Sequence, residues 1–78
     1  FTNEIELTNY KFAVEFEKIK DLNLLARPRF SSTGFYGKLI KNNDKIYFKY
    51  NEENANNAKG QHVVFFYDNF VVGGGEIK

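Results

Sequence analysis

The chain has 78 residues and a mass of 9.1 kDa, which gives room for one domain and excludes a multidomain enzyme. Its charged residues nearly balance at a net charge of +1, so it lacks the strong positive field that marks many nucleic-acid-binding proteins. The sequence has no cysteine and no long apolar run, which excludes a disulfide scaffold, a cysteine-ligated metal and a membrane-spanning helix within these residues.

The residue composition favours β-strands, because aromatic and β-branched residues occupy 27 of the 78 positions. Residues 4–7 alternate between polar and apolar side chains, and so do residues 12–16, which predicts two strands or one strand with an extended lead-in. Three apolar positions there also share helical spacing, so a helix over residues 12–20 is an alternative. Alternation resumes over residues 22–27 and ends at Pro28, which lacks an N–H and belongs at an edge, a bulge or a strand end.

A first hairpin is predicted in the middle of the chain. Residues 35–40 and 45–50 read as strands, and the second of them has the clearest half-buried pattern. Between them lie Asn42, Asn43 and Asp44, residue types that tolerate the backbone angles of tight turns. The sequence therefore predicts two antiparallel neighbours here.

A second hairpin joins residues 62–67 to residues 70–72 through Asp68 and Asn69. Its first strand is apolar on both faces, so it is either central in a closed barrel or covered by another domain. The polar residues 51–59 predict an exposed loop with room for one helical turn. Six or seven short strands with tight turns predict an all-β fold, a small antiparallel β-barrel of about six strands.

Few residues suggest a catalytic, phosphate-binding or metal-binding role. His62 is the only histidine, and we expect it to be a structural or rim residue. The run Gly73–Gly75 lacks the spacing of a phosphate-binding loop and instead predicts a kink or bulge where another backbone packs closely. No metal-ligand spacing surrounds the adjacent Glu52 and Glu53, and we expect no cofactor in this chain.

The two arginines are the most informative cations, since lysine outnumbers arginine nine to two. In an extended segment Arg27 and Arg29 lie on one face about 6.6 Å apart, a spacing that suits neighbouring phosphates, while Pro28 points the other way. Proline also stiffens the segment and lowers the entropy lost when the guanidinium groups are fixed on a ligand. Isolated arginines are equally common on solvated surfaces, so spacing alone leaves RNA contact as a hypothesis.

The C-terminal part carries a more specific pattern. A Gly-Gln pair lies shortly before residues 63–68, which read Val-Val-Phe-Phe-Tyr-Asp, and residues 71–77 read Val-Val-Gly-Gly-Gly-Glu-Ile. This pattern resembles the C-terminus of the bacterial tRNA 2-thiouridylases, the MnmA family. Residues 3–9 resemble that family's passage from its central domain toward a barrel. Residues 25–29 lie where the family has a strand containing Arg-Tyr-Arg.

The resemblance implies a three-domain cytoplasmic enzyme that uses ATP to adenylate the wobble uridine of tRNA and then replaces its 2-oxygen with persulfide sulfur. In such enzymes the ATP site and the catalytic cysteines lie in the N-terminal domain, so this chain alone is expected to be catalytically silent. The chain corresponds to the C-terminal barrel, which is similar to the second domain of elongation factor Tu. We expect the barrel at residues 21–78, with residues 1–20 as the end of the central domain or as lead-in strands.

Because the first residue is Phe1 and not methionine, we expect the chain to be a piece of a longer protein. The implied partners are the anticodon region of tRNA, the catalytic and central domains of the same protein and a sulfur-relay protein, with no membrane.

The resemblance also implies RNA-binding residues. The family's Arg-Tyr pair corresponds to Arg27 and Pro28, its second arginine to Arg29, and its Gly-Gln glutamine to Gln61. Pro28 is a departure, because it lacks both the ring and the hydroxyl of tyrosine and leaves only shape or a carbonyl contact. A rival hypothesis is a non-catalytic interaction barrel whose two-faced apolar strand docks on a neighbouring domain.

Overall fold

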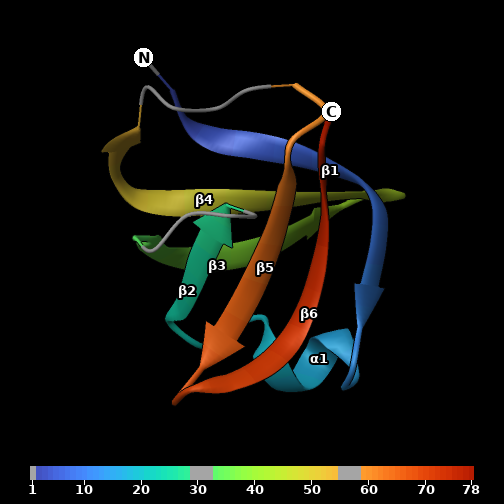
Figure 1. The fold of residues 1–78 in the computed structure, drawn as a ribbon. Helices are drawn as coiled ribbons and strands as arrows, with labels where there is room; N and C mark the ends of the chain where they lie inside the picture. The colour runs from blue at the N-terminus through green and yellow to red at the C-terminus, as the bar shows by residue number, and fades with distance from the viewer. Residues whose placement is uncertain (1, 29–32, 55–58) are drawn as a thin grey trace.

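The computed structural model describes residues 2–28, 33–54 and 59–78 (Figure 1). It contains six strands and one short helix. In chain order these are β1 (Thr2–Phe12), α1 (Phe16–Ile19), β2 (Leu24–Pro28), β3 (Phe35–Asn42), β4 (Lys45–Asn54), β5 (His62–Tyr67) and β6 (Phe70–Ile77).

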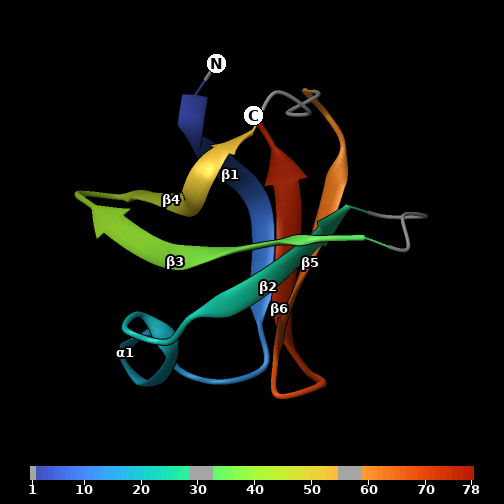
Figure 2. The same ribbon diagram turned by 90° about the vertical axis from the view of Figure 1, so that its left-hand side faces the viewer.

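The strands form a closed barrel in the order β1-β4-β3-β2-β5-β6, with β6 returning to pair with β1. Every neighbouring pair is antiparallel, and Figure 2 shows the strands crossing around a common interior. The predicted all-β antiparallel barrel of about six strands is therefore confirmed. Its likeness to the second domain of elongation factor Tu stays a prediction.

Both predicted hairpins are confirmed. In the first, β3 pairs with β4 from Gly37–Tyr50 to Asn42–Lys45. In the second, Asp68 and Asn69 both have positive φ, at 49° and 68°, which matches the twist of the strands that they connect. The predicted loop over residues 51–59 is wrong at its start, because β4 continues to Asn54, and residues 55–58 lie outside the described part of the chain.

The N-terminal region differs from the favoured prediction. One long strand, β1, pairs with β4 along its first half and with β6 along its second half. After Phe12 the chain leaves the sheet, and α1 follows, so the strand or extended interpretation of residues 12–20 is wrong beyond Phe12. The helical alternative is correct for four residues, because α1 places Ile19 in the core and packs Phe16 against it.

The barrel closes only with β1, so the predicted division at residue 20 does not follow an edge of the sheet. Where the domains of a longer chain would meet stays a prediction. Within the described residues, no helix is long and apolar enough to cross a membrane.

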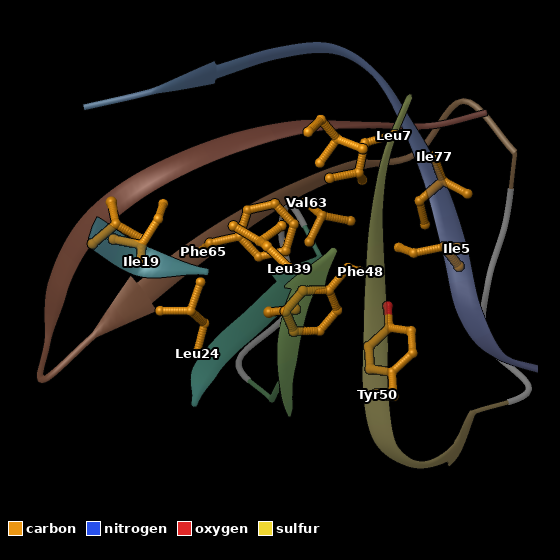
Figure 3. Packing of buried hydrophobic residues seen from close by; sticks show 13 residues of the cluster. Ile5, Leu7, Ile19, Leu24, Leu39, Phe48, Tyr50, Val63, Phe65 and Ile77 are labelled. Atoms are coloured by element: carbon orange, nitrogen blue, oxygen red, sulfur yellow. The ribbon is translucent and has the colours of Figure 1, made fainter. Parts of the chain in front are cut away.

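Alternate side chains of the strands fill the interior (Figure 3). At its centre Phe48 of β4 and Phe65 of β5 are fully buried, with ring centroids 4.9 Å apart. Val63 points inward beside them, whereas Val64 and Phe66 are only half-buried. The two-faced apolar strand is therefore a central strand of a closed barrel, the first of the two predicted alternatives.

The glycines of β6 allow β1 to approach closely, as predicted. A Cβ on Gly73 would lie 2.3 Å from Cδ1 of Phe12 and 2.6 Å from the carbonyl oxygen of Lys11. Just before the glycines the β5–β6 register shifts, because Phe65 pairs with Gly73 while Phe66 pairs with Val71. The predicted irregularity is thus a bulge with one extra residue in β6.

Candidate nucleic-acid interface

Arg27 lies on the outer wall of the barrel. Strand β2 buries Leu24 and Ala26, so the alternation of the strand turns Arg27 outward, opposite Val64 of β5. Its guanidinium carbon lies 5.1 Å from the centroid of the Phe66 ring. The cation therefore stacks on an aromatic face, an arrangement that limits its rotamer freedom.

The charge of Arg27 is not neutralised by another part of the described chain. None of the described carboxylates forms an ion pair with it, although Asp68 lines the same depression of about 340 Å³. Its Nε is buried and has no hydrogen-bond acceptor among the described residues. A buried donor without a partner costs about 1–3 kcal/mol. The residue is thus held by stacking and keeps its positive charge available to an anion.

The other predicted RNA-binding residues are placed differently. Pro28 ends β2, as its missing N–H requires, and pairs with Val63, so it faces the opposite side of the strand from Arg27. Gln61 precedes β5 and is half-buried, and its carbonyl accepts the N–H of Ile77 at 2.9 Å. Arg29 lies outside the described residues.

These placements put part of the predicted site on neighbouring segments but show no contact between its members among the described residues. Strands β2 and β5 are neighbours, so Arg27 and Gln61 belong to adjacent segments of the barrel. Pro28 and Arg27, on opposite faces of one strand, do not share a surface.

His62 is exposed, and its Nε2 lies 3.3 Å from Oε1 of Glu76 on the adjacent strand β6. This contact is an ion pair only when the imidazole is protonated. Among the described residues there is no group of three or more histidines and carboxylates that could hold a metal ion.

The structure shows two surfaces whose extent the sequence did not predict. The first, the outer apolar row, consists of side chains registered across four strands, Tyr36–Leu25–Phe66–Val71. Val71 is 56% exposed and Tyr36 is 54% exposed, so this row leaves apolar area open to solvent. The two-faced apolar pattern of β5 indicated an apolar outer face on that strand. The sequence did not indicate the registers that place β2 and its neighbours beside it.

The second surface, the lysine groove, is a cavity of about 840 Å³ between α1, β3 and β4. Four lysines line it: Lys20, Lys38, Lys41 and Lys49. The net charge of +1 for the whole chain concealed this local gathering.

Comparison with known proteins identifies the domain. The family model described as the aminomethyltransferase beta-barrel domain matches residues 2–77. The whole chain is 77% identical, over 78 residues, to the tRNA-specific 2-thiouridylase MnmA 2 of Fusobacterium nucleatum subsp. nucleatum, and it spans 23% of the length of that relative. No solved structure matches.

These two matches confirm the resemblance to the C-terminal domain of the bacterial tRNA 2-thiouridylases that the glycine-rich motif indicated. The chain therefore belongs to the aminomethyltransferase β-barrel domain family.

Proposed function

We propose that this chain is the tRNA-positioning C-terminal domain of a tRNA-uridine 2-sulfurtransferase that makes 2-thiouridine at the wobble position. The observation that carries the proposal is its 77% identity, along its full length, to a protein named as a tRNA-specific 2-thiouridylase. ATP-dependent adenylation and persulfide sulfur transfer would then belong to other domains of a cytoplasmic protein. A sulfur-relay protein would supply the sulfur, and ATP would be a cofactor of those domains.

In this proposal the barrel holds RNA without reacting with it. Arg27, ordered by its stack on Phe66, would bind a backbone phosphate with little further loss of rotamer entropy. Gln61 would donate its amide to a phosphate or ribose, and Arg29 would add a second cation. Contacts of this kind fix the register of the RNA but carry no sequence information. Selection among tRNAs would therefore depend on the other domains.

The test uses the complete gene product that contains this chain, hereafter the complete protein, with unmodified tRNA and ATP. Arg27→Ala is expected to raise the KM for tRNA about tenfold, as the loss of one charge-assisted hydrogen bond worth about 1.5 kcal/mol implies. The KM for ATP should not change. Lys18→Ala is the matched control, because Lys18 is an exposed cation on α1 and lines neither the depression around Arg27 nor the lysine groove. An unchanged KM for tRNA would remove Arg27 from the RNA footprint.

A second candidate function is docking on a neighbouring domain, and the outer apolar row favours it. Exposed apolar area registered across four strands is typical of a surface that another protein surface covers. Nuclease and hydroxyl-radical footprinting of tRNA on the complete protein discriminates the two. Docking alone predicts that Arg27→Ala leaves the protected nucleotides unchanged, whereas RNA positioning predicts that protection is lost at specific phosphates.

A further inference from the structure

The lysine groove is an unassigned concentration of positive charge. Its lining contains four lysines and two carboxylates, those of Glu17 and Asp21, which leaves a local net charge of +2 in a chain whose total is +1. In Figure 2, α1 and the β3–β4 hairpin lie on the same side of the barrel, away from the β5–β6 hairpin. The groove is therefore formed where the helix faces the two lysine-bearing strands.

The carboxylates at the groove act mainly on one lysine, Lys20, although the charge of Lys41 also contributes to lowering the pKa of Glu17. Glu17 Oε2 lies 2.8 Å from Lys20 Nζ, and this hydrogen bond with its ion pair lowers the pKa of the Glu17 carboxyl and raises the pKa of the Lys20 ammonium. Asp21 acts on the same ammonium through its charge. Lys20 is thus largely compensated by Glu17 of α1 and by Asp21, which follows the helix.

The remaining lysines are not compensated in this way. Lys38 and Lys49 are exposed and directly opposite each other in the β3–β4 pair, and Lys41 lies further along β3. None of these three forms an ion pair with a described residue. Lys49 is registered on its other side with Glu4, which does not line the groove. Like charges directly opposite in a sheet are destabilising, so the fold carries this arrangement at some loss of stability.

The polar residues around these ammonium groups are amides. Asn3, Asn43 and Asn51 line the groove, and each supplies an amide N–H₂ donor. Amide and ammonium donors together are the side chains that contact phosphate and ribose oxygens in nucleic-acid complexes. A cavity with this lining suits a polyanion with regularly spaced phosphates better than a single small anion.

We infer that the lysine groove binds the phosphate backbone of tRNA as a second contact, separate from Arg27. This inference rests on the proposed function as a tRNA-positioning domain. Strand β3 is the neighbour of β2, and the groove begins at Lys38, one residue beyond the part of β3 that pairs with β2. Three ammonium groups that displace counterions would add about 2 to 2.7 to the slope of log affinity against log salt concentration.

The experiment measures binding of an unmodified tRNA transcript to the complete protein between low and physiological salt. The test variant is Lys38→Gln with Lys41→Gln and Lys49→Gln. The matched control, which removes the same charge from exposed lysines outside the groove, carries glutamine in place of Lys11, Lys18 and Lys59. The test variant should bind roughly tenfold to a hundredfold more weakly at about 50 mM salt, with a salt slope lower by about 2. The control should lose much less affinity.

Two further measurements separate function from folding. The melting temperature of the test variant should stay close to that of the wild type, because loss of the opposed pair Lys38–Lys49 is offset by loss of the opposite-charge pair of Lys49 with Glu4. Glu17→Gln should strengthen tRNA binding and steepen the salt slope by about 0.7 to 0.9, because it releases the Lys20 ammonium.

The outcomes distinguish a failure of the proposed function from a failure of the groove inference. If the wild-type protein does not bind tRNA, the proposed function fails. If it binds and the test variant loses no more affinity than the control, the groove inference fails and the proposed function stands. A parallel titration with polyglutamate is included, and an equal loss of polyglutamate and tRNA binding in the test variant would assign the groove to acidic polypeptides and overturn the inference.

Discussion

The contact between Phe48 and Phe65 at the centre of the barrel is open to a double-mutant cycle. Both rings are fully buried, and their centroids lie 4.9 Å apart with the planes inclined by 36°. Replacement by alanine would cost about 3–5 kcal/mol, close to the whole stability of about 4–12 kcal/mol expected for a domain of this size. Leucine is the better probe, because it keeps most of the apolar volume and should cost about 1.5 kcal/mol at each position.

Aromatic pairs in this geometry contribute about 0.5–1.5 kcal/mol beyond their buried area. The double variant Phe48→Leu with Phe65→Leu should therefore be less destabilised than the sum of the single variants by that amount. Urea titration followed by circular dichroism measures the free energy of unfolding, with an unchanged m-value as the check for two-state behaviour. Each single variant should also lower Tm by about 6–12 °C.

The control for this cycle pairs Phe48→Leu with Phe70→Leu, because Phe70 is 71% exposed on the β5–β6 hairpin. These two substitutions should be additive within about 0.3–0.5 kcal/mol. If the Phe48 and Phe65 substitutions are additive to the same tolerance, the two rings do not form the central contact of the core.

Two further predictions concern β6 and α1. Gly73→Ala should destabilise the domain by about 1–3 kcal/mol, because the added Cβ would overlap Phe12. Gly60→Ala should cost only about 1 kcal/mol of backbone strain, because its φ is +82° but no atom lies near the added Cβ. Equal losses of unfolding free energy in urea titrations of the two variants would contradict the close approach of β1 to Gly73. The pKa of Glu17 is lowered mainly by the hydrogen bond from Lys20, so the stabilisation is present above the ordinary pKa of 4.5 and lost as the pH falls through the lowered value. The Tm difference between wild type and Glu17→Gln should accordingly disappear in acid, and its persistence there would refute the assignment.

Local sequence signals were sufficient for much of the fold. Residues such as Asn43, Asp68 and Asn69 adopt positive φ readily, so the positions of the two hairpins follow from short-range preferences. The path of residues 12–20 could not be read in the same way, because strand alternation and helical spacing both fitted it. Burial of Ile19 against the end of the barrel decided between them, and that is a tertiary effect.

The candidate site likewise contains one part that local sequence signals indicate and one part that depends on long-range pairing. The opposition of Lys38 and Lys49 follows from the two-residue turn at Asn43 and Asp44, so the lysine groove left a readable signal on its β3–β4 side. The stack of Arg27 on Phe66 could not be foreseen, because the β2–β5 register joins segments far apart in the chain with no turn to set it.

The double pairing of β1 bears on how the domain can be handled. The first strand pairs with β4 on one side and with β6 on the other. A shortened polypeptide that begins after residue 12 would therefore expose the unpaired edges of both β4 and β6 to solvent. Such edges recruit strands from other molecules, so a trimmed version would tend toward aggregates. The N-terminal strand thus closes the barrel, and any fragment prepared to contain the folded domain must begin before β1.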